Sequence, residues 1–149
     1  MRKQLSLFLL SFSLLSTNIS ADEITCLTDA LYHESRGESH LGKLAIANVV
    51  FNRIDSGKFP NNVCGVVYQK TGKTYQFSWV KKKKKVDPEL YNEIKKISKK
   101  IYEDRHKLPD TTNGATFFHS TSVSPRWKGL TKTAKIGKHR ILRNVTLVV

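Results

Sequence analysis

The sequence predicts an α+β domain in which about three helices are followed by a minor antiparallel sheet. Two observations lead to this prediction. Over most of the chain, apolar residues recur at the spacing of one helix face. After Asn113-Gly114, short runs of aromatic and branched residues alternate with turn-forming residues, which is typical of strands. Because the helices and strands do not alternate, the two kinds of structure are expected to segregate.

The first 21 residues are set apart by their composition. Arg2 and Lys3 precede an apolar run from Leu5 to Leu15, and a polar stretch then leads to Ala21. This order indicates a secretory signal peptide, with cleavage expected after Ala21 and export to the periplasm or the cell exterior. A retained membrane anchor is the alternative, although the run is shorter than the ~20 residues that a spanning helix needs. Residues 22–149 have the length of one domain.

The first helix is predicted from Ile24 to about Arg36. Leu27, Leu31 and Glu34 recur on one side of it, and Gly37 is a natural stop. The carboxylate of Glu34 should therefore lie in the last turn of a helix whose other members on that side are apolar.

Two further helices are expected. The second, from about Ser39 to Ser56, has little polar surface, so it should be central, and Asn48 and Asn52 would then need hydrogen-bond partners. The third begins after Asp87, a favourable N-cap followed by Pro88, and continues to the break at Leu108-Pro109.

The strands are expected at residues 115–119 and 140–142. A further strand is possible on composition at residues 145–149, and Gly137-Lys138 should turn the chain between the last parts of the sheet.

The charge of the chain indicates a polyanionic partner. The formal net charge is +14, and removal of residues 1–21 lowers it by only two, since Arg2 and Lys3 are the charged residues lost. For an exported protein, the anions to expect are peptidoglycan, anionic lipids and wall polymers, and no nucleic acid is expected. The run Lys81–Lys85 is either a solvated loop or a further point of attraction to an anionic envelope.

Cys26 and Cys64 are the only two cysteines. In an exported chain an even count favours a disulfide, and two buried thiols are the alternative. A bridge would join the start of the first helix to the loop after the second, with Glu34 between its two ends.

Glu34 is the candidate catalytic acid. Cleavage of a glycosidic bond needs a proton for the leaving oxygen, and an apolar setting allows a carboxylic acid to hold that proton near neutral pH. Position alone does not separate this role from that of a half-exposed acid at a helix end.

Five ordered segments carry a resemblance to a known family. The first is Cys26-Leu27-Thr28-Asp29-Ala30-Leu31-Tyr32-His33-Glu34-Ser35-Arg36-Gly37-Glu38. The others lie at residues 42–53, 59–69, 76–79 and, late in the chain, at 115–119 with 125–127 and at 136–139. Together they resemble the spore-cortex-lytic cell wall hydrolase family (SleB/CwlJ type), whose opening segment is written A-x-x-x-Y-x-E-A-R-G-E. Ser35 stands where alanine is common in that family.

The resemblance implies a small lysozyme-like domain, related to goose-type lysozymes and lytic transglycosylases, that uses no cofactor. It implies that Glu34 is the general acid for cleavage of the β-1,4 bond between N-acetylmuramic acid and N-acetylglucosamine. In a lytic transglycosylase the same carboxylate then removes a proton from the sugar's own 6-hydroxyl, so that no second acid is needed. A hydrolytic muramidase would use water and, in many cases, a second carboxylate. Glu38 is interpreted as a structural residue that closes the loop.

Further residues are expected to line a glycan site, where hydrogen-bonding side chains and flat apolar faces are needed. They are Tyr68, Gln69, Gln76, Ser78 and His119, with Trp79 and Trp127 able either to stack on sugars or to fill the core. We expect a monomer.

Two rival functions stay open. A zinc-dependent amidase would cut the peptide stem instead, but the chain has no His-Glu-x-x-His motif, and His33 and His40 are too far apart on one helix for joint ligation. No metal site is therefore expected. An exported, non-enzymatic cationic protein that binds envelopes would explain the charge but not the ordered segments.

Overall fold

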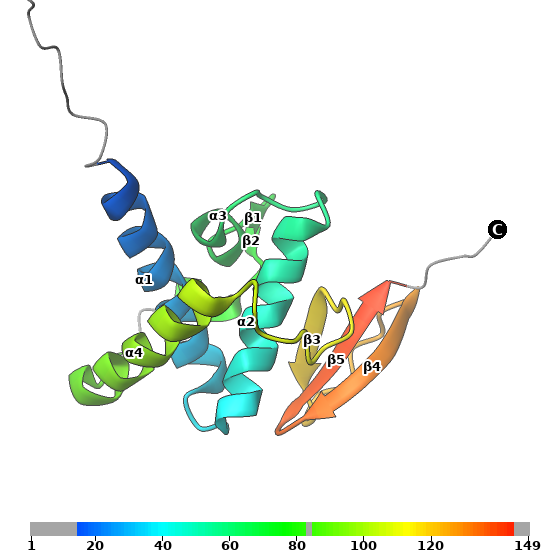
Figure 1. Cartoon of the computed structure of the whole chain (residues 1–149). Helices are drawn as coiled ribbons and strands as arrows, with labels where there is room; N and C mark the ends of the chain where they lie inside the picture. The colour runs from blue at the N-terminus through cyan, green and yellow to red at the C-terminus, as the bar shows by residue number, and fades with distance from the viewer. Residues whose placement is uncertain (1–14, 83–84, 145–149) are drawn as a thin grey trace, which may run out of the picture.

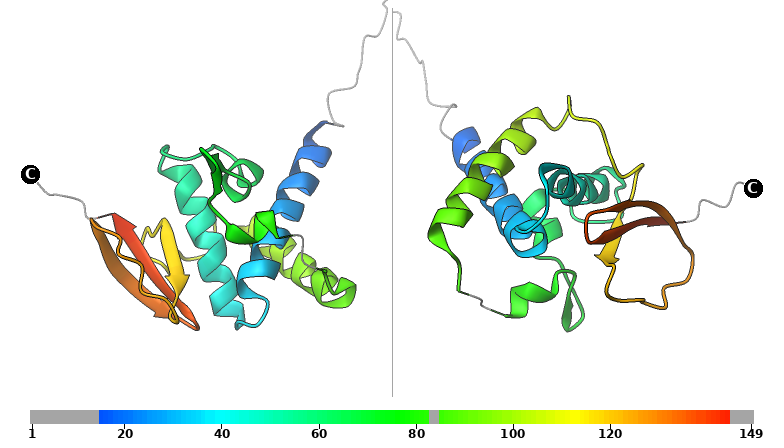
Figure 2. Two further views of the ribbon diagram at one scale, coloured as in Figure 1. Left: turned by 180° about the vertical axis from the view of Figure 1, so that it is seen from behind. Right: turned by 90° about the horizontal axis from the view of Figure 1, so that it is seen from below.

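The computed structural model describes residues 15–82 and 85–144, and it has the predicted α+β architecture. Helix α2 (His40–Asp55) lies at the centre, between the pair formed by α1 (Leu15–Ser35) and α4 (Pro88–Asp104) on one side and a three-stranded sheet on the other (Figure 1). The views from behind and from below show the same order (Figure 2). A short helix, α3 (Val63–Val67), packs against both α1 and α2.

The predicted helix starts are confirmed for α2 and α4. Ser39 is the N-cap of α2 and accepts a hydrogen bond from the amide of Gly42. Asp87 caps α4 by accepting from the next two free amides, with Pro88 as the first helical residue. Helix α4 ends at Asp104, before the predicted Leu108, because the chain there closes a tight turn onto the Asp104 carbonyl.

Helix α1 begins at Leu15, well before the predicted start at Ile24. No glycine or proline interrupts residues 15–23, so nothing in the local sequence stops the helix from extending upstream. The described residues contain no helix that is both long and apolar enough to cross a membrane.

The main sheet is antiparallel and has the order β3-β5-β4. Its strands are β3 (Phe117–Ser120), β4 (Leu130–Ile136) and β5 (His139–Asn144), with Gly137 in the turn between β4 and β5 as predicted. A two-residue hairpin, β1 (Lys70–Thr71) with β2 (Thr74–Tyr75), and a 3₁₀ turn, η1 (Ser78–Lys81), precede α4. The strand proposed at residues 145–149 lies outside the described residues.

Two apolar clusters hold these layers together. The larger one joins the helices and includes Leu27, Leu31, Ile46 and Ile94. The smaller one includes Val49 of α2, which packs against the inner face of the sheet.

Asn48 and Asn52 fix the loop that leads from α4 to the sheet. The amide of Asn48 donates to the carbonyl of Pro109 and the hydroxyl of Thr111. That of Asn52 donates to the carboxylate of Asp110, among other acceptors. The side-chain amides of both asparagines thus find their hydrogen-bond partners more than 50 residues farther along the chain.

The predicted disulfide is present. Cys26 and Cys64 are bonded, and their Cα atoms lie 5.1 Å apart. Next to the bridge, the buried carboxylate of Glu23 accepts hydrogen bonds from the amides of Val63 (2.6 Å) and Cys64 (3.2 Å). The first turn of α3 is therefore held to α1 both covalently and by charge-assisted hydrogen bonds.

Candidate active site

An open cleft of about 750 Å³ lies between the end of α1, the β2–η1 segment and the sheet. Glu34 lies in its wall and is the one acidic residue among those that line it. The other lining residues are Arg53, Tyr75, Gln76, Phe77, Ser78, Phe117, Phe118, His119, Ser120, Arg126, Trp127, Lys128, Leu130 and Asn144.

Glu34 comes from the last turn of α1, as the sequence predicts. The adjacent Ser35 is 1% exposed, and its hydroxyl donates to the carbonyl of Leu31 at 2.8 Å. The loop that follows is held from within by Lys43, whose buried ammonium group donates to the carbonyls of Glu38 and Arg36. Burial lowers the pKa of Lys43, and the nearby charge of Glu38 opposes that effect. The end of α1 is thereby fixed against α2.

Arg53 supplies a buried positive charge at the cleft. It is only 5% exposed, and its Nε donates to the carbonyl of Thr116 at 2.8 Å. Its guanidinium carbon lies 5.1 Å from the ring centroid of Phe59 and 5.5 Å from that of Phe77, both within cation–π range. Burial lowers the pKa of Arg53 to about 10, and the negative charge of Glu34 opposes the decrease. Arg53 therefore stays protonated at neutral pH.

Three of the five predicted lining residues meet Glu34 in the cleft. Gln76 and Ser78 reach it from the β2–η1 segment, and His119 reaches it from β3. The Nδ1 of His119 lies 2.7 Å from the carbonyl of Ser120. Since a carbonyl can only accept, Nδ1 carries the proton, and Nε2 is the acceptor in the neutral ring.

The other two predicted residues do not line the cleft. The hydroxyl of Tyr68 donates to the carboxylate of Asp29 at 2.5 Å, and Tyr91 donates to the other oxygen of the same carboxylate at 2.6 Å. Burial and these bonds to Asp29 raise the pKa of both tyrosines. Through Asp29, Tyr68 thus links the end of α3 to α1 and α4. Gln69 is half-buried, and its carbonyl accepts from the amide of Gln76 at 3.0 Å.

The two tryptophans have different surroundings. Trp79 packs against the main core and stacks on His33, with ring centroids 4.4 Å apart. Trp127 is 48% exposed on the cleft, beside the rings of Phe117 and His119. Its open face is the flat apolar surface that a sugar ring would need.

Glu38 does not line the cleft but lies against the β4–β5 turn. Its Oε1 accepts from the amide of Lys138 at 3.1 Å and lies 4.0 Å from Nδ1 of the buried His139. A side chain at Gly137 would overlap the carboxylate of Glu38. Glu38 thus connects the loop after α1 to the sheet.

The described residues contain no group of three or more His, Cys, Asp or Glu side chains arranged to hold a metal ion. Burial lowers the pKa of His139, the charge of Glu38 opposes that effect, and the nearby charge of His119 adds to it.

Sequence reasoning did not single out Arg53, Arg126 or Lys128. In the sequence Arg53 follows an apolar run and resembles the charged end of a helix. Only the aromatic rings that the fold places around it show that it is buried.

The structure thus combines an α+β fold with one carboxylate in a cleft lined by aromatic and hydrogen-bonding side chains. The chain belongs to the Cell Wall Hydrolase family, which matches residues 37–141. Glu34 lies just before the matched segment.

Proteins similar in sequence to this chain include spore cortex-lytic enzymes. The chain is 33% identical over 122 residues to that of Bacillus cereus and 31% identical over 122 residues to that of Bacillus subtilis, in each case over 80% of this chain. These matches span 44% and 37% of the two relatives, so the chain corresponds to less than half of their length.

Two solved structures share the fold over most of this chain. The catalytic domain of the Bacillus cereus SleB protein matches with a TM-score of 0.62 and 28% identity, covering 83% of this chain and 91% of that domain. The catalytic domain of the germination-specific lytic transglycosylase SleB from Bacillus anthracis matches with a TM-score of 0.61 and 30% identity, covering 82% and 94%.

Proposed function

We propose that this protein cleaves the glycan strands of peptidoglycan at the β-1,4 bond after N-acetylmuramic acid, with Glu34 as the general acid and base. The observation that carries the proposal is the position of Glu34: it is the one acidic residue among those that line the cleft, in the last turn of α1. The family match and the likeness to catalytic domains of cortex-lytic enzymes support it.

The cleft favours the transglycosylase route over hydrolysis. Many hydrolases that act on glycans need a second carboxylate to stabilise the reacting sugar or to activate water. Among the described residues Glu38, the nearest acid in sequence, is turned toward Lys138 and the sheet instead of the cleft. In the proposed reaction Glu34 donates its proton to the leaving oxygen. As a carboxylate it then takes the proton of the sugar's 6-hydroxyl, whose oxygen closes onto the anomeric carbon as a 1,6-anhydro ring.

The remaining lining residues would position the sugars. Gln76, Ser78 and the Nε2 of His119 offer hydrogen bonds, and Trp127 offers a stacking face. The proposal also includes export after removal of residues 1–21, since peptidoglycan lies outside the cytoplasmic membrane.

The test is mass spectrometry of the products that the protein releases from purified peptidoglycan. Anhydro ends indicate transglycosylation, reducing ends indicate a muramidase, and free peptides indicate an amidase. Glu34→Gln should lower the rate of muropeptide release by at least about 10²-fold, the lower range for removal of a general acid, while the thermal melt stays nearly unchanged. Full activity in that variant would refute the role of Glu34.

A further inference from the structure

The outer face of the sheet, meaning the face turned away from α2, contributes residues to the lining of the cleft, and Phe118 and Ser120 line it from the other face of β3. Directly paired residues of an antiparallel sheet lie on the same face. Ile141 pairs with Phe118 and Ala134, and these three pack toward Val49 of α2. The outer face therefore consists of the alternate positions.

Two cross-strand rows make up most of this face. One row is His119–Arg140–Lys135, and the other is Phe117–Leu142–Lys132, each running β3-β5-β4. A third pair, Asn144 with Leu130, continues the same alternation. The residues of this face that line the cleft are Phe117, His119, Leu130 and Asn144. Lys132, Lys135 and Arg140 therefore lie on the same face of the sheet as these four lining residues.

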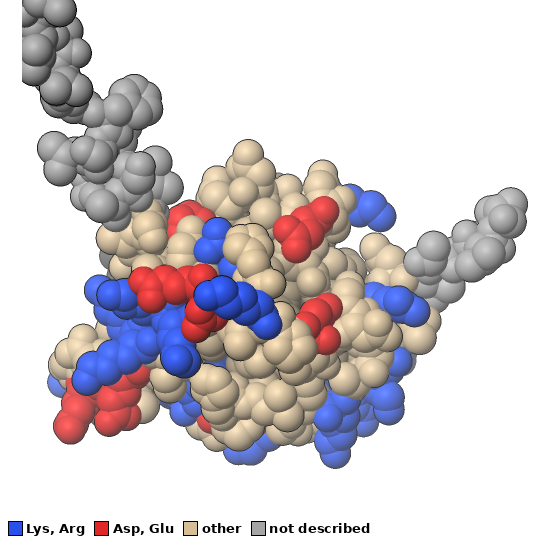
Figure 3. Space-filling view, viewed as in Figure 1, with Lys and Arg blue, Asp and Glu red and all other residues tan. Residues whose placement is uncertain are grey.

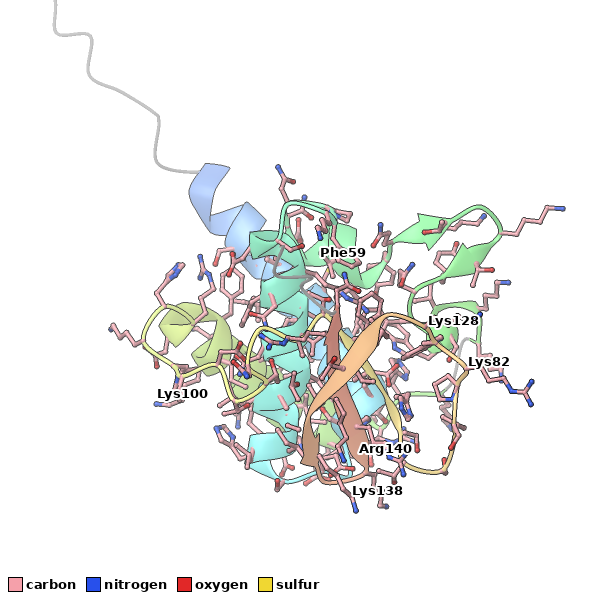
Figure 4. All side chains as sticks on the ribbon, turned by 90° about the vertical axis from the view of Figure 1, so that its right-hand side faces the viewer. Phe59, Lys82, Lys100, Lys128, Lys138 and Arg140 are labelled. Carbon is pink, nitrogen blue, oxygen red and sulfur yellow. A yellow bond between two sulfur atoms is a disulfide. The ribbon has the colours of Figure 1, made fainter. Side chains whose placement is uncertain are left out.

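The charge on this face is of one sign. Lys132, Lys135 and Arg140 are all exposed, and residues 111–149 contain no aspartate or glutamate. Of the ion pairs recorded among residues 15–82 and 85–144, none includes a lysine or arginine of the sheet. Figure 4, which looks onto this side of the molecule, shows Arg140 and Lys138 close together at the lower end of the sheet and Lys128 higher up.

Lys135 and Arg140 are directly opposed in register. Like charges at opposed positions of a sheet are destabilising. The arrangement therefore costs the free protein some stability, which an anion bound between the two side chains would restore.

The basic residues of α4 are arranged differently. There, Lys99 pairs with Glu103, and Lys107, just beyond the helix, pairs with Asp104. Figure 3 shows basic and acidic side chains intermixed over α4, whereas the basic side chains over the sheet stand without acidic neighbours. The lysines of α4 thus share their helix with four carboxylates, whereas the strands of the sheet carry none.

We propose that Lys132, Lys135 and Arg140 form an accessory binding surface for the carboxylates of peptide stems on the peptidoglycan polymer whose glycan strand occupies the cleft. This inference rests on the proposed function for the identity of the polymer. It predicts that the protein discriminates in favour of polymeric, carboxylate-bearing wall over short or uncharged glycans.

The test measures binding separately from catalysis. In the Glu34→Gln background, the triple variant Lys132→Gln/Lys135→Gln/Arg140→Gln is sedimented with purified sacculi at several salt concentrations. A matched control, Lys95→Gln/Lys96→Gln/Lys100→Gln, removes the same charge from exposed positions of α4. We expect the sheet variant to bind about 5–50-fold more weakly and to show a smaller salt dependence, as three screened ion pairs would give. The control should change binding by less than about 2-fold.

Chemical neutralisation of the wall gives the second arm. Sacculi whose carboxylates have been amidated should bind the Glu34→Gln protein as weakly as unmodified sacculi bind the sheet variant, and the two losses should not add. In the active background the sheet variant should show a raised KM on sacculi, an unchanged kcat, and wild-type rates on short soluble glycan oligomers. Its thermal melt should be equal to or above that of wild type, whereas a purely structural role for these cations would lower it.

Several outcomes would overturn the inference. They are equal losses in the sheet variant and the control, unchanged binding to amidated sacculi, or a loss confined to anionic lipid vesicles, which would assign the surface to a membrane. If the binding results are as expected but the wild-type protein releases no muropeptides, the proposed function is wrong and the inference about the binding surface still holds.

Discussion

The disulfide between Cys26 and Cys64 should supply much of the stability of this small domain. The bond joins residues 38 apart in sequence. In the loop-entropy description, a cross-link of that span disfavours the unfolded chain by about 4 kcal/mol. For a domain of this length each kcal/mol corresponds to roughly 3–5 °C in Tm, so the double variant Cys26→Ala/Cys64→Ala should melt about 10–20 °C below wild type.

The assay is a thermal melt followed by circular dichroism, with the wild type measured with and without reductant. Glu23→Gln is the matched control, because it weakens the hydrogen bonds to the amides of Val63 and Cys64 at the same junction but keeps the covalent bond. We expect it to cost about 1–3 kcal/mol, and the double variant to cost more. A double variant that melts within about 3 °C of wild type would refute the reasoning, since the unfolded chain would then gain no measurable freedom from loss of the bond.

Three further predictions concern single residues. Gly137→Ala should destabilise the protein by about 2–4 kcal/mol in a denaturant titration, because the new methyl group would overlap Glu38 and residue 137 has a φ of +54°. The control Gly114→Ala, at φ +73° with open space around it, should cost only about 1–2 kcal/mol. Equal costs for the two variants would contradict the role of the contact with Glu38. Trp127→Ala should raise KM for peptidoglycan by about 5–100-fold with little change in Tm, since the side chain is 48% exposed; an unchanged KM would exclude stacking. Burial lowers the pKa of His139, so the unfolded chain binds a proton first as the pH falls, and stability should be lost progressively below pH ~6.5. Urea midpoints measured between about pH 7 and 5 should therefore fall less steeply in His139→Asn than in wild type. Parallel slopes for the two proteins would refute this prediction.

The parts of the fold that the sequence predicts are those with a long or strongly capped local pattern. Helix α4 combines a clear apolar stripe with an N-cap at Asp87, and α2 is almost continuously apolar, so neither depends on distant contacts for its definition. Their ends are less well defined, as the early close of α4 at Asp104 shows.

The elements that the sequence does not reveal depend on tertiary contacts. Helix α3 has only five residues, and part of its capping comes from Glu23, far away in sequence. Strand β4 carries a register shift between Lys132 and Ala134, which interrupts the alternation by which a strand is recognised.

The same distinction applies to the site. Glu34 and His119 could be named as candidates because they stand in recognisable segments, and both line the cleft. Tyr68 stands in such a segment too, but its hydroxyl is bonded to Asp29, a partner that no local pattern indicates. Arg53 becomes a candidate only when the aromatic rings around it are seen.

The buried hydroxyl of Ser35 has a consequence for how this lineage can vary. Because it is satisfied within its own helix by the carbonyl of Leu31, no neighbouring residue has to change when serine replaces alanine there. Position 35 can therefore hold either serine or alanine without a compensating mutation elsewhere. Larger side chains should destabilise the protein at this position, because the residue is buried. Variation beside the candidate acid is therefore compatible with an unchanged geometry at Glu34.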